Sequence, residues 1–424
     1  MSAEAGRAIR PTVELEHSVH LPPSKSYTNR AYIAAALASG SSVIHNRSQS
    51  DDSEYLLSAL REFGIPVKTG NEPLRIEGSD GALKVPDNEI FVGNAGTAMR
   101  FLTSFASLAP GTVRMTGDEQ MLRRPVQDLL DSLKIAGIHT SSENGFPPIV
   151  VRGGSLGGGS INMNGTVSSQ FLSSMLLYAP YAKHPTTLRV KGELRSRPYI
   201  DMTLHVMRSF GAMVDVAEPN IFTVSNRDRY IGREFSIEGD ATSATYFAAA
   251  AAITKGKVYI ENISRESVQG DVAFFSILEE MGCSISERDD GIEIVGGSLS
   301  GIELDMNNLP DCVPTLAVVA LFASGPTTIT NVGHLRHKES NRLVAIAAEL
   351  KKLGAGVELF DEGVTIRPGK LSGATIETYN DHRMAMSFAI AGLAIPGVRI
   401  INPDCVSKSY PEFWSEFEKL EGKA

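Results

Sequence analysis

Segments of ten or eleven almost uninterrupted apolar or small residues recur along the chain, and small polar or charged residues precede each of them. The six segments are 31–40, 99–108, 171–180, 245–254, 315–325 and 384–393. A glycine or proline and then a short run of β-forming residues follow each segment. Because a helix that is apolar on all sides is typical of a protein core, the pattern predicts six buried helices, each followed by a strand.

A second kind of segment alternates with the first and is apolar on one face only. Its copies are 51–65, 123–138, 196–212, 271–283 and 338–355, and a weaker sixth copy is 409–420. Five copies carry a glycine just before their last residue, namely Gly64, Gly137, Gly211, Gly282 and Gly354. Glycine at this position is typical of the left-handed turn that ends a helix. We therefore expect amphipathic helices that cover the buried ones.

Together the two patterns define a β-α-β-α-β module that occurs six times at a spacing of about 70 residues. Six such modules are too many for one hydrophobic core, so we expect an α/β protein with three modules in each of two domains. The repeat alone also allows a scaffold without catalytic activity.

Composition narrows the possible functions. The chain has 424 residues, a net charge of -9 and a pI near 5.6, which does not favour binding to nucleic acid. The three cysteines, Cys283, Cys312 and Cys405, form no CxxC pair, so neither a zinc site nor a disulfide framework is expected. The first residues lack the apolar stretch of a secretory signal, and no apolar run is long enough to span a membrane. We expect a cytoplasmic monomer that binds neither membranes nor nucleic acid.

Polar groups suited to an anion gather where the buried helices begin. Lys25, Ser26 and Arg30 surround the first opening, and Gly96 lies in the second. A helix N-terminus presents unpaired N–H groups and a partial positive charge. If the helices of each domain point the same way, two facing domains would form a positive cleft in an acidic protein. No P-loop or dinucleotide-binding glycine motif occurs, so a nucleotide is not the expected anion.

Ten motifs resemble, in order and spacing, those of the 5-enolpyruvylshikimate-3-phosphate synthases, a family of enolpyruvyl transferases. They are LPPSKSYTNRA, GNAGTAMR, LRRP, SSQF, RSRPYID, GDATSATYFAAAA, LPDCVPTLA, HLRHKESNRL, YNDHRMAM and SKSYPEF. The resemblance implies a two-domain inside-out α/β barrel with six inverse β-α-β-α-β-β repeats. It also implies a discontinuous first domain, residues 1–22 and 239–424, a second domain, residues 23–238, and an active site in the cleft between them.

The resemblance further implies a reaction. The 5-hydroxyl of shikimate 3-phosphate adds to phosphoenolpyruvate, and the tetrahedral intermediate then loses phosphate, with no metal or cofactor required. Asp311, Glu339 and Lys25 would be catalytic. Shikimate 3-phosphate would contact Lys25, Ser26, Arg30, Ser168, Ser169, Gln170, Ser196, Asp311, His334 and Lys338. Phosphoenolpyruvate would contact Lys25, Gly96, Arg124, Gln170, Arg342, Arg383 and Lys408.

Simpler interpretations exist for several of these residues. Asp311 could cap a helix, and Glu339 could form an ordinary ion pair with Arg342 at helical spacing. His334 and Asn341 differ from the residues usual in the family. The related UDP-N-acetylglucosamine enolpyruvyl transferases share the fold and the phosphoenolpyruvate chemistry. They usually carry a cysteine in a loop that here reads TGDEQMLRRP, without one.

Overall fold

The computed structural model describes residues 6–68, 73–288 and 290–422. The chain divides into two compact units. Unit 1 comprises Met1–Pro22 and Gly239–Ala424, and unit 2 comprises Pro23–Glu238. The chain passes between the units twice, after Pro22 and after Glu238.

Unit 2 contains two modules that are continuous in sequence. The first has β6 (Ile90–Phe91), α3 (Gly96–Phe105), β7 (Thr112–Thr116), α4 (Gln127–Ile135), β8 (His139–Glu143) and β9 (Phe146–Arg152). The second has β10 (Gly159–Asn164), α5 (Ser169–Tyr178), β11 (Thr186–Lys191), α6 (Arg197–Ser209), β12 (Val214–Glu218) and β13 (Ile221–Val224). In both, the first two strands are parallel and the last two return antiparallel. These are the expected β-α-β-α-β-β units.

One module in each unit takes its first strand from elsewhere in the chain. In unit 2, α1 (Lys25–Leu37), β3 (Ser41–His45), α2 (Asp51–Glu62), β4 (Val67–Lys68) and β5 (Leu74–Glu77) are completed by β14 (Glu234–Ser236). In unit 1, α7 (Ala241–Thr254), β15 (Lys257–Glu261), α8 (Ala273–Met281), β16 (Ser284–Arg288) and β17 (Gly291–Val295) are completed by β2 (Glu16–His20). Thus β2 precedes α1 in sequence but pairs with β15, and β14 precedes α7 but pairs with β3.

Two further modules complete unit 1. One contains β18 (Glu303–Asp305), α9 (Val313–Val319), β19 (Thr327–Thr330), α10 (Arg342–Lys352), β20 (Gly356–Phe360) and β21 (Gly363–Arg367). The other contains β22 (Thr375–Ile376), α11 (His382–Gly392), β23 (Arg399–Ile400) and α12 (Phe413–Phe417), and β1 (Arg7–Ala8) pairs antiparallel with β23. The described residues therefore form six small sheets, three in each unit.

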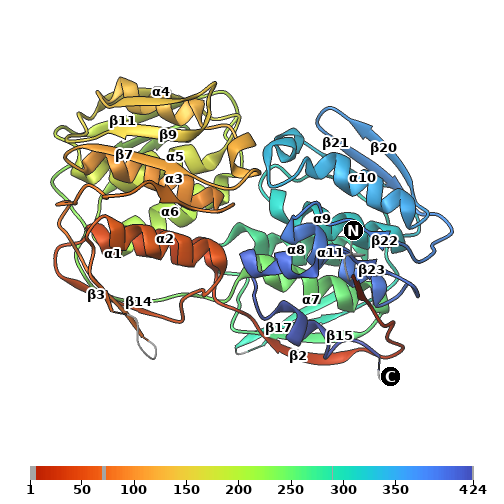
Figure 1. The fold of residues 1–424 in the computed structure, drawn as a ribbon. Coiled ribbons are helices and arrows are strands. Elements are labelled where there is room, and N and C mark those ends of the chain that lie inside the picture. The colour runs from red at the N-terminus through yellow and green to blue at the C-terminus, as the bar shows by residue number, and fades with distance from the viewer. Residues whose placement is uncertain (1–5, 69–72, 289, 423–424) are drawn as a thin grey trace. The chain divides into compact units, whose positions relative to one another are not determined.

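The predicted buried helices are confirmed. Every residue of α3, α9 and α11 is buried, and only Thr254 of α7 is not. In unit 2, α1, α3 and α5 pack against one another, and in unit 1, α7, α9 and α11 do the same (Figure 1).

Neighbouring buried helices run parallel within a unit. Thr97 and Gln170, in the first turns of α3 and α5, are joined by a hydrogen bond of 3.2 Å. Ser104 and Ser174, further along the same helices, lie 2.6 Å apart. In unit 1, Arg383 in the first turn of α11 donates to Asp311, just before α9, at 2.7 Å, and further along Thr315 of α9 and Ser387 of α11 are 3.0 Å apart. Parallel packing brings helix N-termini, with their partial positive charges, to one end of each unit.

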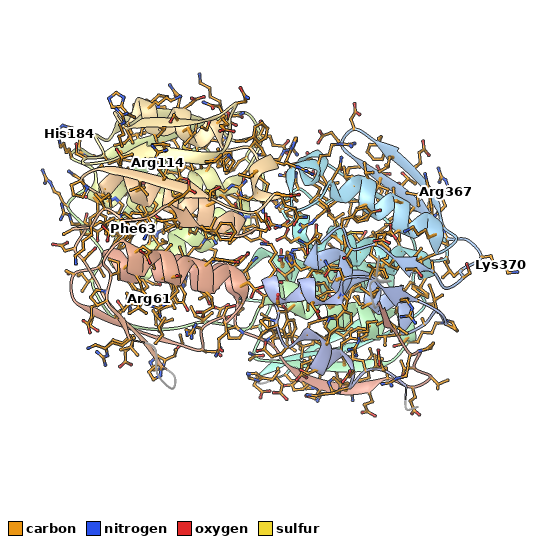
Figure 2. The ribbon with its side chains drawn as sticks, viewed as in Figure 1. Arg61, Phe63, Arg114, His184, Arg367 and Lys370 are labelled. Carbon is orange, nitrogen blue, oxygen red and sulfur yellow. The ribbon has the colours of Figure 1, made fainter. Side chains whose placement is uncertain are left out.

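The five amphipathic helices that end in glycine also form as predicted, although two begin later than expected. The weaker sixth copy is helical only over α12, Phe413–Phe417. All five glycines that end the other copies have positive φ, between 84° at Gly64 and 118° at Gly282. Arg61 and Phe63, at the end of α2, are labelled in Figure 2. Arg61 is exposed, whereas Phe63 is buried, and its ring centroid lies 4.9 Å from that of Phe105. The helix in 123–138 starts only at Gln127, and the helix in 338–355 only at Arg342.

Among the described residues no helix is both long and apolar enough to cross a membrane. The same residues contain no group of three or more His, Cys, Asp or Glu placed to hold a metal ion.

Candidate active site

The residues predicted to bind substrate fall into two clusters, one in each unit. Unit 2 holds Lys25, Ser26, Arg30, Gly96, Arg124, Ser168, Ser169, Gln170 and Ser196. Unit 1 holds Asp311, His334, Lys338, Glu339, Arg342, Arg383 and Lys408.

In unit 2, Lys25 is the first residue of α1 and is paired with a carboxylate. Its Nζ lies 3.0 Å from Oδ2 of Asp52, and the two side chains are only 11% and 4% exposed. Asp52 is not among the site residues predicted from the sequence. It lies in the acidic first turn of α2, a position where a carboxylate usually serves only the helix itself. The structure shows that it also orients the lysine.

Arg30 is buried inside unit 2 and is surrounded by neutral oxygens. It donates to the carbonyl oxygen of Ser26 at 2.8 Å, to Oγ1 of Thr203 at 2.8 Å and to the carbonyl oxygen of Tyr199 at 3.1 Å. Its guanidinium also lies over the rings of Phe101 and Tyr199. Burial lowers the pKa of Arg30 to about 10, so it is charged at neutral pH. Tyr199, near the start of α6, therefore links α6 to α1 through Arg30.

Gly96, the first residue of α3, leaves room for two arginines. A Cβ at Gly96 would lie 2.7 Å from Nη1 of Arg100 and from both terminal nitrogens of Arg124. Arg124 in turn donates to the carbonyl and side-chain oxygens of Asn94 at 3.4 and 3.3 Å. The missing side chain therefore lets two cations approach one helix N-terminus, which favours an anion there.

Serine hydroxyls and an amide line the opening of α5. Ser168 caps the helix by accepting from the backbone N–H of Gln170 at 3.2 Å. The Gln170 side chain reaches Oγ1 of Thr97 in the first turn of α3, so the openings of α3 and α5 are connected. Ser196 precedes α6 in a left-handed conformation, with φ of 55°. A non-glycine residue in this conformation often marks a functional position.

In unit 1, Arg342 is held by three carboxylates. It donates from Nε and Nη2 to both oxygens of Asp381 at 2.8 and 3.1 Å. It also donates to Oδ1 of Asp311 at 3.0 Å and to Oε2 of Glu339 at 2.7 Å. Burial disfavours the charged guanidinium, but Asp381, Glu339 and Asp311 together raise the pKa of Arg342 above its ordinary value. Its role in unit 1 is therefore to orient acidic groups as well as to carry charge.

Asp311 is the centre of this cluster. Its Oδ2 accepts from Nη2 of Arg383 at 2.7 Å, while its Oδ1 is shared by Arg342 and, at 3.7 Å, by Nζ of Lys338. Burial opposes ionisation of Asp311, yet Arg383, Lys338 and Arg342 hold the pKa of this carboxyl well below its usual range. The simpler idea that Asp311 only caps a helix does not account for three cations.

The spacing of Glu339 and Arg342 predicted that both lie in one helix. In the structure, Lys338 and Glu339 lie in a bend before α10 instead. For that reason both side chains reach the same cluster. Glu339 lies 4.0 Å from Nζ of Lys408, in addition to its bond with Arg342. His334 is buried in the 3-10 turn Gly333–His337 that precedes Lys338, and its contact with substrate stays a prediction.

Three buried residues of unit 1 were not anticipated as part of the site. Asp381, which caps α11, binds Arg342 from 39 positions away. Tyr246, within α7, accepts from Nη1 of Arg383 at 3.2 Å. Asp271 accepts a hydrogen bond from Thr242, and burial raises the pKa of its carboxyl to about 6. Asp381 and Tyr246 could have been suspected from their places in the motifs YNDHRMAM and GDATSATYFAAAA, whereas Asp271 lies in none of the motifs.

The arrangement combines acid–base groups with anchored cations. An ionised carboxylate, a second carboxyl and two arginines lie within hydrogen-bonding reach of one another in unit 1. Helix N-termini, Lys25, Arg30 and Arg124 supply positive charge in unit 2. Such groups suit phosphate- and carboxylate-bearing substrates and proton transfer.

The chain is similar to known proteins along nearly its whole length. The family model for EPSP synthase (3-phosphoshikimate 1-carboxyvinyltransferase) matches residues 9–417. A 3-phosphoshikimate 1-carboxyvinyltransferase of Trichormus variabilis is 40% identical over 414 residues, covering 96% of this chain and 97% of the relative. One from Serratia proteamaculans is 42% identical, covering 97% and 98%. The solved structure of an EPSP synthase from Acinetobacter baumannii has a TM-score of 0.81 at 28% identity and covers 98% of both chains.

Proposed function

Since the chain belongs to the family of EPSP synthases, we propose that both clusters serve one reaction, the transfer of an enolpyruvyl group from phosphoenolpyruvate to the 5-hydroxyl of shikimate 3-phosphate. The observation that supports this proposal most strongly is the convergence of Asp311, Glu339 and their cationic partners in unit 1. In this proposal unit 2 mainly binds shikimate 3-phosphate, and unit 1 carries the acid–base chemistry.

The phosphate group of shikimate 3-phosphate suits the cluster around α1 and α5. Arg30 is a buried cation whose described hydrogen bonds all go to neutral oxygens, so an incoming dianion would be the first full charge to compensate it. Ser168, Ser169 and Gln170 offer hydroxyl, amide and helix N-terminal donors. Phosphate binding at such helix ends is a general property of their unpaired N–H groups.

Phosphoenolpyruvate carries a phosphate and a carboxylate, and each suits an arginine. We assign these groups to Arg124, Arg342, Arg383 and Lys408, and we assign the Gly96 backbone, next to Arg124, to the same substrate. Lys25 is assigned to both substrates. In unit 1 this binding would draw Arg342 and Arg383 away from full pairing with Asp311, because an added anion competes for the same donors.

The chemistry needs one proton acceptor and one proton donor. Asp311 accepts the proton of the 5-hydroxyl as that oxygen bonds to C2 of phosphoenolpyruvate, and Glu339 delivers a proton to C3. The intermediate then loses a C3 proton and its C2–O bond to phosphate, which leaves the enolpyruvyl ether. Three cations keep the pKa of Asp311 low in the described state, so it is a weak base there. Anion binding to those cations raises its pKa and strengthens it as a base.

The test is phosphate release. The protein is incubated with phosphoenolpyruvate alone, with added shikimate 3-phosphate, or with added UDP-N-acetylglucosamine, and free phosphate is measured. Release that depends on shikimate 3-phosphate is expected. Release only with the nucleotide sugar, or none with either acceptor, would overturn the proposal.

A second experiment tests whether both units serve one reaction. If they do, the two substrates together reduce the radius of gyration in small-angle scattering, and an unchanged profile contradicts this part of the proposal.

A further inference from the structure

Tyr246 of α7 is a buried tyrosine that contacts a site arginine. It is 1% exposed, and its hydroxyl oxygen accepts from Nη1 of Arg383 at 3.2 Å. The other terminal nitrogen of the same guanidinium donates to Asp311 at 2.7 Å. The backbone N–H of Arg383 is fixed by Asp381 at 3.0 Å. The direction of the Arg383 side chain is therefore defined by the phenol on one branch and the carboxylate on the other.

A phenol acts differently from a carboxylate at this position. Burial raises the pKa of Tyr246 above its ordinary value, even though Arg383 opposes the shift, so the hydroxyl stays neutral at working pH. Arg342, by contrast, is bound by Asp381, Glu339 and Asp311. Tyr246 thus orients one branch of the Arg383 guanidinium without cancelling its charge.

Aromatic residues near the C-terminus hold Tyr246 in place. The ring of Phe413 packs edge-on against Tyr246 with centroids 5.9 Å apart. Phe413 also contacts the rings of Tyr410, Trp414 and Phe417. The position of the hydroxyl is consequently set by α7 and by packing, and removing the oxygen alone would leave this packing in place.

We propose that Tyr246 is a positioning residue for Arg383, which directs one branch of the guanidinium to Asp311 and preserves its charge for the anionic groups of phosphoenolpyruvate. The inference rests on the proposed function, because it assumes that Arg383 binds that substrate. It extends the site to a residue of α7 that does not itself contact the reacting atoms.

The test compares Tyr246→Phe with Tyr410→Phe. Tyr410 is as deeply buried and packs on the same Phe413, but no bond to Arg383 is seen for it among the described residues. The loss of a hydrogen bond to a charged group is expected to raise the KM for phosphoenolpyruvate about tenfold in Tyr246→Phe. The KM for shikimate 3-phosphate should change less than about twofold, and Tyr410→Phe should resemble the wild type in both.

A second readout is the pH profile. Asp311 faces Arg383, Lys338, Arg342, Glu339 and Asp271. A less well-placed Arg383 lowers the pKa of Asp311 less, so the acidic limb of kcat/KM should move to higher pH in Tyr246→Phe and not in Tyr410→Phe. A merely structural role for the hydroxyl would not produce this shift.

The outcomes separate the two proposals. If the wild type releases no phosphate with shikimate 3-phosphate, the proposed function fails. If the wild type is active and Tyr246→Phe has unchanged KM values and an unchanged pH profile, this inference fails. Should Tyr246→Phe fold poorly, Phe413→Leu, which keeps the hydroxyl but removes its packing partner, should shift the KM for phosphoenolpyruvate in the same direction, and an unchanged KM would overturn the inference.

Discussion

Arg30 and Arg342 are buried to a similar depth, at 2% and 1% exposure, but lie in opposite electrostatic environments. Arg30 of unit 2 donates to two carbonyls and a hydroxyl, and burial lowers its pKa. Arg342 of unit 1 donates to three carboxylates, which raise its pKa. Within the part of the chain that the structure describes, no carboxylate forms an ion pair with Arg30.

The different hydrogen-bond partners of Arg30 and Arg342 indicate two different roles for a buried arginine. A charge held only by neutral dipoles gains most when an anion arrives, since isolated buried charges are costly. A charge already paired with carboxylates gains less, but it fixes the position and the ionisation state of those carboxylates. We therefore assign the binding of shikimate 3-phosphate chiefly to the first environment. We assign the acid–base chemistry, beside the arginines proposed for phosphoenolpyruvate, to the second.

The largest effect is expected from Lys25→Met. Lys25 combines both environments, because it lies at a helix opening and is also paired with Asp52. Its loss removes a cation assigned to both substrates and leaves Asp52 without this partner. We expect kcat/KM for phosphate release to fall by about 10³-fold or more. Lys68→Met, at an exposed lysine of β4, is the control, and wild-type rates in Lys25→Met would refute the assignment.

Asp311→Asn tests the unit 1 side of the comparison. The substitution preserves shape but removes the proton acceptor between Arg342 and Arg383. We expect kcat to fall by about 10²- to 10⁴-fold, the usual contribution of a general base. Asp361→Asn, at an exposed carboxyl between β20 and β21, should leave kcat unchanged. A kcat within about threefold of the wild type in Asp311→Asn would exclude it as the base.

Arg30→Lys tests the unit 2 side. Lysine keeps the charge but cannot reach Ser26, Thr203 and Tyr199 with one planar group. The KM for shikimate 3-phosphate should rise about tenfold, while the KM for phosphoenolpyruvate changes little. Arg75→Lys, at an exposed arginine of β5, is the matched control. An equal rise in both KM values would show that Arg30 does not act on shikimate 3-phosphate alone.

The smallest effect is expected from Asp271→Asn, and it concerns the melting temperature of the protein as a function of pH. The pKa of Asp271 is raised to about 6 in the folded protein, against about 3.9 in an unfolded chain. The folded state therefore binds the proton of Asp271 more tightly than the unfolded chain does. The resulting contribution to the free energy of unfolding is fully present below about pH 4 and is lost as pH rises through about 6. In Asp271→Asn the melting temperature should exceed that of the wild type by a few degrees at pH 8.

The difference should shrink toward pH 4, where the wild-type carboxyl is protonated and resembles the amide. Melting curves of both proteins across this range provide the measurement. A difference that is constant with pH would show that Asp271 has an ordinary pKa in the folded state.

Features set by local sequence were predictable. The apolar runs became the buried helices, and glycines such as Gly64 and Gly282 adopt the positive φ expected of helix-ending turns. The beginnings of helices were less accurate. The 3-10 turn Met121–Arg123 and Pro125 lie before α4, and Lys338–Ser340 forms a bend before α10. Neither segment differs in apolar spacing from the helix that follows, so the spacing could not show where the helix begins.

Contacts between distant modules were not predictable from periodicity. The partners of Lys25, Arg342 and Arg383 lie 27, 39 and 137 positions away, at Asp52, Asp381 and Tyr246. The pattern of apolar and polar positions does not distinguish these residues from helix caps or core. The exchange of β2 and β14 between modules is likewise invisible in a repeat pattern, since either strand would fit either sheet, and only the family resemblance suggested it.

The most direct test of the division between binding and chemistry is calorimetric titration of shikimate 3-phosphate into the wild type, Arg30→Lys and Glu339→Gln, combined with phosphate release. Arg30→Lys should weaken binding about tenfold, because the guanidinium and not charge alone recognises the phosphate. Glu339→Gln should bind shikimate 3-phosphate within about twofold of the wild type and yet lose most turnover. Unchanged binding by Arg30→Lys together with lost binding by Glu339→Gln would contradict the account.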